Sequence, residues 1–525
     1  MNDFMTKCWP GYTTVLLASG GLAASLVGCE GGPLAGGADA GVQLRTQVIV
    51  EHRQQMAALA GSDAVTVQRK ESDLMTRLSE ERRSELDTMS GSQAYADVEL
   101  DAGTDLTGQP GGEMVAVSLD EAVAMAVEGN LDLAVARMGP AIGEMQLEQA
   151  DAAFDWTFFA DGALQKLDTP QPAGTVPGLS NDVQEDIRSL NTGIRKDVLA
   201  TGGRIQIETT IARKERIPSF FAVDHYYDAD ALVSLRQPLL RGFGSSVTKT
   251  QIELAATARD TAKEELRQSL NDLVGKVERA YWDLALAHRG VLIQQRLLER
   301  TTIERDRLED RAGYDTTPVR VTEANSRVEL RRADLIRVRS QVRSASDTLK
   351  RLLNSDDLPL ANETLLQPTD MPTDEPVAFS LYDEVTTALE QRPELARNLL
   401  SIRDAELRQR LADNASLPKL DLTASAGLNG IDNDDWEDAY SDLGDGDYID
   451  YSAGLSFEQP LGNRGPEALA SQRRLEREQA SLAYRREAQT VVLEVKNALR
   501  AVLTNYQLVG ATRAARWAAA DSLRA

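Results

Sequence analysis

Cysteine, histidine and aromatic residues are scarce in this chain of 525 residues. It has two Cys, three His and 5% aromatic residues, and acidic residues outnumber basic ones by 82 to 57. So few cysteines exclude a disulfide-stapled fold, and a formal charge of −25 argues against a broad nucleic-acid-binding face. No interior run reaches 18 apolar residues. This excludes membrane-spanning helices but leaves a β-barrel open, because alternating strands give only a weak hydropathy signal.

Groups that could form a catalytic or metal centre are equally sparse. His52, His225 and His288 have no metal-ligand spacing, and no Ser or Cys nucleophile motif accompanies them. The acidic run 432–450 could attract Ca²⁺, but it lacks the EF-hand order, and we favour a solvated loop. Gly242-Phe243-Gly244 lacks the final glycine and the βαβ context of a phosphate-binding loop. The sequence therefore predicts no enzyme, no cofactor and no metal site.

The N-terminal residues indicate export from the cytoplasm. Residues 1–28 have the pattern of a secretion signal, with Lys7 near the start and an apolar, Gly/Ala-rich run before Cys29. The segment Leu26-Val27-Gly28-Cys29 resembles a bacterial lipobox, which implies cleavage before Cys29 and its acylation. An ordinary cleaved signal followed by a chance cysteine is the alternative. In the acylated case the mature chain keeps no free thiol, because Cys8 leaves with the signal.

Two halves of the chain repeat each other. Residues 118–123 (SLDEAV) are echoed by 380–385 (SLYDEV), and 233–239 (VSLRQPL) by 455–461 (LSFEQPL), in the same order. Such recurrence indicates an internal duplication. We predict five regions: a signal at 1–28, a flexible Gly-rich and charged tether at 29–115, a first repeat at 116–355, a Pro-rich and acidic linker at 356–379, and a second repeat at 380–525.

Each repeat reads as helix, strands, helix. Ser118 and Ser380 are predicted N-caps, each with an acidic residue three positions later. Some helix is also expected in the tether, near 65–89. The strands are expected at 156–167, 194–199, 204–213 and 229–239 in the first repeat, and at 420–428 and 451–457 in the second. The first repeat thus has an extra hairpin, 194–213, which either enlarges the sheet or projects from it.

Long helices with a 4-3 spacing of apolar residues follow the strands. One seam runs from Leu266 to Leu298, and a second runs from Val321 to Leu352 after a turn at 313–318. This pattern predicts an antiparallel helical hairpin whose first arm, 245–312, spans about 100 Å. The second repeat carries the same seam from Ala488 to Val509. It reaches Ala525 before any counterpart of the descending arm, so we expect its last helix to be missing from this sequence.

These features resemble the outer membrane efflux protein family, the TolC-like channels. The motifs are Ser118-Leu119-Asp120-Glu121-Ala122-Val123 with Asn130-Leu131-Asp132-Leu133, Gln237-Pro238-Leu239-Leu240-Arg241-Gly242-Phe243-Gly244, and Arg311-Ala312-Gly313-Tyr314. The resemblance implies an α+β membrane protein with an internal two-fold repeat. It also implies a homotrimer, in which an outer-membrane β-barrel is continued by a long periplasmic α-helical coiled-coil barrel.

The resemblance also assigns two sites. One is a tip that docks a periplasmic adaptor protein, formed by Ala312, Gly313, Tyr314, Thr317, Pro318 and Val319. The other is the junction between barrel and tunnel, formed by Pro238, Gly242, Gly244, Pro460 and Gly462. Family members often carry an acidic residue after the tip turn. Arg320 stands at that position here, with Glu323 one helical turn further on, so an acidic ring is not expected.

The implied function is the outer-membrane exit channel of a tripartite efflux system, anchored by lipid and working with an adaptor and an inner-membrane pump of RND or ABC type. Two alternatives remain. One is the exit channel of a type I protein secretion system, which uses the same family. The other is a lipid-anchored periplasmic coiled-coil scaffold without a pore.

Overall fold

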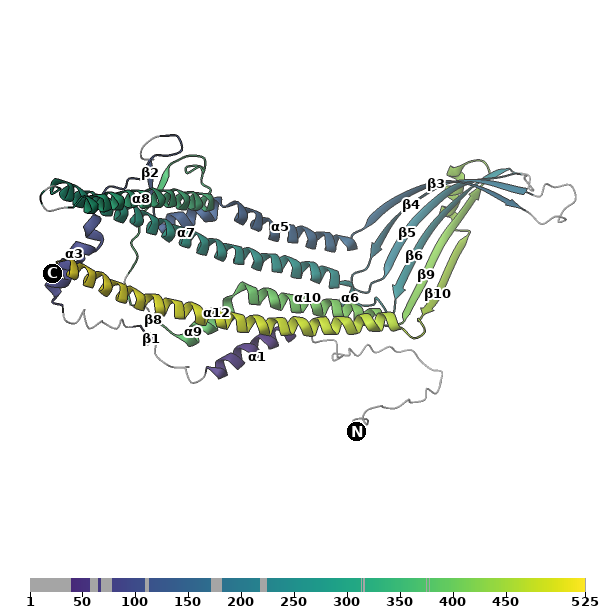
Figure 1. Cartoon of the computed structure of the whole chain (residues 1–525). Helices are drawn as coiled ribbons and strands as arrows, with labels where there is room; N and C mark the ends of the chain where they lie inside the picture. Colours follow the sequence, from purple (N-terminus) through teal and green to yellow (C-terminus); the bar gives the residue numbers. More distant parts are fainter. Residues whose placement is uncertain are drawn as a thin grey trace.

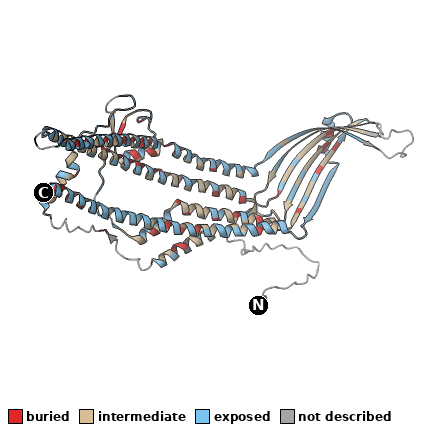
Figure 2. Ribbon diagram, in the orientation of Figure 1, coloured by how far each residue is buried: buried red, intermediate tan, exposed pale blue. Residues whose placement is uncertain are grey.

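The chain folds into a six-stranded antiparallel sheet continued at one end by a bundle of long helices (Figure 1). The computed structural model describes residues 39–56, 65–67, 78–108, 113–170, 182–217, 224–312, 314, 317–373, 375–376 and 378–524. Most buried residues lie on the facing sides of the helices, and both sheet surfaces are largely open in the single chain (Figure 2). The α+β fold class is therefore confirmed.

The sheet has the strand order β10-β9-β6-β5-β4-β3. The strands are β3 (Thr157–Pro170), β4 (Asp182–Asp197), β5 (Arg204–Ile217), β6 (His225–Pro238), β9 (Lys419–Asp432) and β10 (Ile449–Glu458). Four strands come from the first repeat and two from the second, as predicted. The prediction for β4 was wrong by 12 residues at its start. Charged residues on both faces of 182–193 hide the period-two pattern, and the strand is defined by pairing with both neighbours.

The acidic run between β9 and β10 was predicted as a loop but contains a helix, α11 (Trp436–Asp445). Asp435 caps it by accepting hydrogen bonds from the backbone N–H groups of Glu437 and Asp438, at 2.9 and 3.0 Å. Ala439 and Leu443 are buried against Ala229 of β6. The acidic residues therefore occupy one side of an amphipathic helix that packs on the sheet.

The helical hairpin matches the predicted seams. It consists of α7 (Thr250–Asp310) and α8 (Pro318–Leu353). The seam residues Leu273, Val277, Ala280, Leu284 and Val291 of α7 are buried, as are Ala324, Val328, Leu335, Val342 and Leu349 of α8. A short helix, α6 (Ser245–Thr248), leads into α7 from the sheet. With 61 residues, α7 is about 90 Å long at ~1.5 Å per residue.

The part of α7 nearest the sheet pairs with α5 (Leu131–Asp151), which begins where α8 ends. Asn130 donates to the carbonyl of Leu352 at 2.9 Å, and Asn354 donates to the carbonyl of Gly129 at 2.9 Å. The preceding helix, α4 (Leu119–Gly129), carries the predicted capping box between Ser118 and Glu121. Together α5 and α8 flank α7 along most of its length.

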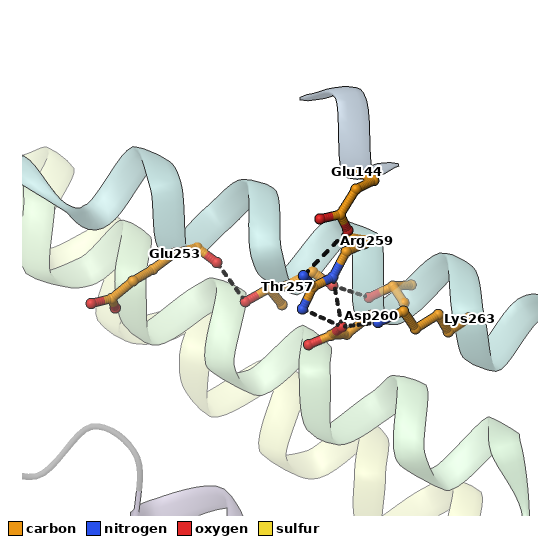
Figure 3. A network of polar contacts seen from close by, with 7 residues as sticks. Glu144, Glu253, Thr257, Arg259, Asp260 and Lys263 are labelled. Carbon is orange, nitrogen blue, oxygen red and sulfur yellow. Dashed lines mark hydrogen bonds and ion pairs between the residues drawn. The ribbon is translucent and has the colours of Figure 1, made fainter. Parts of the chain in front are cut away.

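The second repeat builds the same arrangement from α9 (Leu381–Gln391), α10 (Pro393–Ala415) and α12 (Arg464–Arg524). Ser380 caps α9 by accepting from the N–H of Asp383. Arg259 of α7 pairs with Glu144 of α5 in the same repeat at 3.4 Å. Glu253 of α7 joins the two halves by pairing with Arg410 of α10 at 3.4 Å. Figure 3 shows Arg259 bridging toward Glu144 and Asp260.

The predicted tether is more structured than expected in its described parts. Helix α1 (Asp39–Gln55) buries Val48 and Ile49 against α9, α10 and α12. Helix α3 (Glu80–Ser90) buries Leu86 against Trp517 near the end of α12, and Asp87 accepts a hydrogen bond from Trp517 Nε1 at 2.9 Å. The expected helix near 65–89 is thus confined, within the described residues, to 80–90. Short apolar patches inside charged runs had concealed these contacts.

Short strands tie the predicted linker to the helices. Strand β7 (Leu365–Pro368) pairs in parallel with β2 (Met114–Val117), and β8 (Ala378–Phe379) pairs with β1 (Val65–Thr66). Leu365 and Leu366 are buried beside the α7–α8 hairpin. A 3-10 turn, η2 (Ser92–Tyr95), and the residues after it contact α7, where Arg296 pairs with Asp97. A second such turn, η3 (Ala152–Phe154), leads from α5 to β3.

Candidate functional site

The sheet has two chemically different faces because side chains alternate along each strand, and directly paired residues of antiparallel strands share a face. The register therefore assigns every strand residue to one side. We call these sides the apolar face and the polar face. They are the candidate functional site, since a sheet with two such faces can separate two different solvents.

The apolar face is continuous across all six strands. Ile194, Ile207 and Val233 follow one another on β4, β5 and β6, and Ala426 and Tyr451 complete the row on β9 and β10. Its exposed large members are Phe158, Leu164, Leu190, Ile194, Ile207, Val233, Leu235, Ile449, Tyr451, Leu455 and Phe457. Val233 is 48% exposed although it lies on a central strand. Only the part near α11 is covered by other described residues of the chain. An apolar surface of this extent requires a partner other than water.

Aromatic residues lie at both ends of the apolar face. Trp156 is 54% exposed at the end near the helices, and the Lys196 ammonium lies 5.4 Å from the centre of its ring. At the far end, Trp436 and Tyr440 on α11 are exposed. Aromatic girdles with a neighbouring basic residue are typical of the two interfaces of a membrane.

The polar face carries hydrogen-bonded side chains on neighbouring strands. Asn191 donates to Glu208 at 3.1 Å, and Ser425 bonds Ser452 at 2.8 Å. Arg204 bonds both carboxylate oxygens of Asp197, at 2.6 and 3.0 Å. Apolar exceptions on this face include Phe159, Leu167, Ile187, Leu232 and Ile431. The remainder is suited to contact with water.

The five residues predicted at the junction lie where strands end and helices begin. Pro238 is the last residue of β6, and Pro460 follows β10. Gly242, Gly244 and Gly462 have φ values of +88°, +94° and +86°, which residues with a Cβ rarely adopt. The Gly242 N–H donates to Asn414 Oδ1 at 2.8 Å, which fixes the turn to the end of α10. The geometry fits the predicted place; the role of these residues as a barrel-to-tunnel junction stays a prediction.

A charged cavity of about 410 Å³ lies beside this junction, and its lining includes Arg204, Arg236, Arg241, Lys419 and Asp421. Asp421 is 4% exposed and accepts two hydrogen bonds from Arg236, at 2.6 and 3.0 Å. The sequence analysis did not identify this cluster. The sequence did offer a signal: Arg236 stands next to the Gln-Pro pair of β6, and Arg204 and Lys419 begin β5 and β9. Their proximity depends on strand order, which periodicity does not give.

The predicted tip residues lie at the far end of the α7–α8 hairpin from the sheet. Tyr314 is 94% exposed and Val319 is 67% exposed. Thr317 is the N-cap residue of α8, and Pro318 is its first residue, a position that tolerates proline. Ala312 donates its N–H to the carbonyl of Glu309 at 2.9 Å. Gly313 lies outside the described residues.

Cys29 and the predicted signal also lie outside the described residues, which begin at Asp39. None of the described helices is apolar enough over 18 residues to cross a membrane. In the same part of the chain, no group of three or more His, Cys, Asp or Glu side chains is arranged to hold a metal ion.

Solved structures with the same fold are outer-membrane or membrane proteins. A membrane protein from Pseudomonas aeruginosa is 22% identical, with a TM-score of 0.55 over 75% of this chain and 79% of that chain. CusC, a protein that forms a transmembrane channel, is 17% identical, with a TM-score of 0.52 over 79% of this chain and 82% of that one. The Campylobacter jejuni outer membrane channel CmeC is 13% identical, with a TM-score of 0.50 over 77% and 82%.

Comparison with curated proteins gives no match to the sequence. Residues 385–525, most of the second repeat, match the outer membrane efflux protein family. The match confirms the predicted family resemblance in the second repeat, and the TolC-like fold covers both repeats. Residues 385–525 therefore resemble the outer membrane efflux protein family in sequence, and the chain as a whole has the TolC-like fold of outer-membrane channels.

Proposed function

We propose that the protein is the outer-membrane exit channel of a tripartite efflux system and that three copies form one channel. The observation that carries the proposal is the sheet with one exposed apolar face and one polar face. In a closed wall the apolar face contacts lipid and the polar face lines water. A single chain cannot do this, because open strand edges leave unpaired N–H and C=O groups that lipid cannot satisfy.

The lengths of the elements support this placement. β10 has 10 residues and β6 has 14, and a tilted strand of about 9–11 residues crosses a bilayer. The aromatic residues at the two ends of the apolar face then lie at the headgroups. The helices extend on the periplasmic side, where α7 carries the tip about 90 Å from the sheet.

The partners follow from the tip. Tyr314 and Val319 present apolar surface at the end of a rigid hairpin, where nothing in the described chain covers it. We propose that a periplasmic adaptor protein docks there and connects the channel to an inner-membrane pump of RND or ABC type. Acylation of Cys29 would add a lipid anchor on the same membrane.

One pair of measurements tests the channel. The full-length product, purified in detergent, is expected to have three times the mass of a single processed chain and to give stepwise conductance in planar lipid bilayers. A monomer that gives no conductance would contradict the proposal.

Surface labelling separates the channel from the alternative of a periplasmic scaffold. A cysteine introduced at Tyr440, which is 48% exposed on α11, should react with a membrane-impermeant maleimide on intact cells. Reaction only after the outer membrane is broken would favour the scaffold.

Export assays separate small-molecule efflux from protein secretion. Deletion of the gene is expected to increase sensitivity to small toxic compounds and to leave the set of secreted proteins unchanged. The reverse pattern would assign the protein to a type I secretion system.

A further inference from the structure

The two repeats contribute unequally to the sheet. Comparison of their ends shows which strands correspond. Gln-Pro-Leu stands at the end of β6 and directly after β10, so these strands are equivalent. β3 and β9 are equivalent because each follows the helix that returns to the sheet, α5 or α10. In the second repeat β9 pairs directly with β10, whereas in the first repeat β4 and β5 lie between β3 and β6. The duplicated unit is therefore one hairpin, and β4–β5 is an insertion into it.

The inserted hairpin, β4–β5, is part of the six-stranded sheet and does not project from it. β4 pairs with β3 from Thr157↔Arg195 to Pro170↔Asp182, and β5 pairs with β6 from Arg204↔Arg236 to Glu215↔His225. Its residues continue both faces. Ile194 and Ile207 lie on the apolar face, and Asn191 and Glu208 lie on the polar face.

The turn of the inserted hairpin is fixed to the junction. The Gly244 N–H donates to the carbonyl of Thr201 at 3.3 Å, and Gln237 donates to the same carbonyl at 3.1 Å. Gly202 has φ +75°, and a Cβ there would lie 2.3 Å from the carbonyl oxygen of Gly242. These contacts anchor β4–β5 at the same level as the strands that lead into α6 and α12.

The insertion leaves the closing edges of the sheet unchanged. β3 and β10 are the edge strands of the described sheet, and every residue of β10 is exposed. Neighbouring strands alternate in direction, and six is an even number. β10 of one copy therefore runs antiparallel to β3 of the next, as all other neighbours do. The extra hairpin adds only to the perimeter.

We propose that this insertion widens the channel, so that three copies close an eighteen-stranded wall (three times six) where the duplicated hairpin alone would give twelve (three times four). The inference rests on the proposed function. Barrel diameter grows roughly linearly with strand number, so the wall is about 1.5 times wider, and barrels of 16–18 strands keep an aqueous channel. With strands ~4.8 Å apart and tilted by ~40°, the backbone diameter is about 36 Å against about 24 Å.

The width sets the class of cargo. After side chains occupy roughly 5 Å on each side of the wall, water-soluble cargo up to about 25 Å across fits the eighteen-stranded barrel, against about 14 Å for twelve strands. An α-helix with its side chains is about 10–12 Å wide, so the wider wall admits cargo of the size of a helical hairpin.

A deletion of residues 182–217 provides the matched variant. It removes β4 and β5 and joins the segment after β3 to the segment before β6; β3 ends and β6 begins at the same end of the sheet. Thr157 of β3 and Ser234 of β6 lie in one row of paired residues, joined by Arg195 and Gln206, and so they share a face of the sheet. Direct pairing of β3 with β6 can therefore leave the apolar and polar faces of both strands unchanged. β3 and β6 can then pair directly, as β9 and β10 do in the second repeat.

The test combines electron cryo-microscopy of the full-length trimer with polymer exclusion in planar bilayers, using polyethylene glycols of graded size added on the side of α11. We expect eighteen strands in the wild-type wall, and a polymer cut-off radius about 1.8-fold larger than in the deletion variant, the ratio of the two widths left between the side chains. A closed wall of twelve strands with β4–β5 outside it, or equal cut-offs for both proteins, would overturn the inference while leaving the channel intact. If the deletion variant does not assemble, the wild-type strand count decides alone. Absence of any closed wall in the wild type would overturn the proposed function itself.

Discussion

Tyr281 is the residue whose contacts hold most segments together. It is fully buried on α7, and its Oη lies 2.6 Å from Asp370 Oδ2 and 3.2 Å from the Val117 carbonyl oxygen. It also accepts from the N–H groups of Thr369 and Asp370, both at 3.1 Å. Burial raises the pKa of Tyr281, and its hydrogen bond holds the pKa of Asp370 below the usual value. One hydroxyl thus joins α7 to the end of β2 and to the residues after β7.

We expect Tyr281→Phe to lower the free energy of unfolding by about 1–3 kcal/mol, because the backbone groups around it lose their partner. Thermal unfolding in detergent measures the change. Tyr484 on α12 is a matched control: it is 1% exposed and has no hydrogen-bond partner within the described chain. Equal losses for Tyr281→Phe and Tyr484→Phe would contradict the assigned role of the hydroxyl.

His288 predicts a pH dependence of stability. It is buried on α7, and burial lowers its pKa, against a smaller opposing effect of a hydrogen bond with the backbone of Leu366. The folded chain therefore resists a proton that the unfolded chain accepts below pH ~6.5. The stability that the chain gains by keeping His288 neutral is fully present above pH ~6.5. It is lost as the pH falls from ~6.5 toward the pKa of His288 in the folded state.

Thermal midpoints measured between pH 5 and 7.5 test this sign. The wild type should lose stability on acidification, and His288→Gln should lose less over the same range. A variant with the same slope as the wild type would show that other groups dominate.

At the scale of elements, the seam of the α7–α8 hairpin predicts a contrast between two neighbouring leucines. Leu284 is fully buried in the seam, whereas Leu286 is 71% exposed on the same helix. We expect Leu284→Ala to lower the free energy of unfolding by about 2–5 kcal/mol and Leu286→Ala to change it by less than about 0.5 kcal/mol. Denaturant unfolding of the two variants measures this difference. Similar losses for both would show that the seam is not the stabilising contact.

Contacts between α3 and the end of α12 form a second testable element. Leu86 is fully buried against Trp517 and Ala520, and Arg516 pairs with Asp87. Trp517→Ala should therefore release α3, with faster hydrogen exchange across 80–90 and no change in α8. Unchanged exchange in α3 would contradict the contact.

The sequence predicted the helices better than the strands, for a physical reason. A 4-3 spacing is a local property, and the seams of α7 and α8 are buried where it placed them. The first twelve residues of β4 and the whole of α11 were missed because their apolar residues are few and lie among charges. Ala439 and Leu443 are buried by packing against Ala229, which is more than 200 positions away in the chain, so no local pattern predicts their burial. The charged cavity at the junction was missed for the same reason, because its lining residues come from strands that are far apart in the sequence.

At the scale of the whole molecule, the duplication was visible in the sequence and the sheet's composition was not. The Gln-Pro-Leu pairs mark the equivalent strands, and from them the order helix, strands, helix follows for each half. Which strand pairs with which, and in what register, requires the structure. Only the register shows that Arg204, Arg236 and Asp421 share one face while Val233 and Leu235 share the other.

The tip gives a prediction for the assembled system. Tyr314→Ala should lower the resistance to toxic compounds that the system confers, because the adaptor loses an aromatic contact. It should leave the conductance of the purified channel unchanged. Leu360→Ala, an exposed residue in the connection after α8, serves as the control. Loss of conductance in Tyr314→Ala, or equal loss of resistance in both variants, would contradict docking at the tip.

The central claim is that the sheet separates lipid from water, and β6 tests it most directly because it is a central strand. Spin labels are attached to single cysteines at positions 232, 233, 234 and 235 of the protein in lipid vesicles, and collisions with oxygen and with a water-soluble nickel chelate are measured. Val233 and Leu235 lie on the apolar face, and Leu232 and Ser234 lie on the polar face. We predict strong oxygen collisions at 233 and 235 and strong chelate collisions at 232 and 234. Equal access of the chelate to all four positions would contradict the claim.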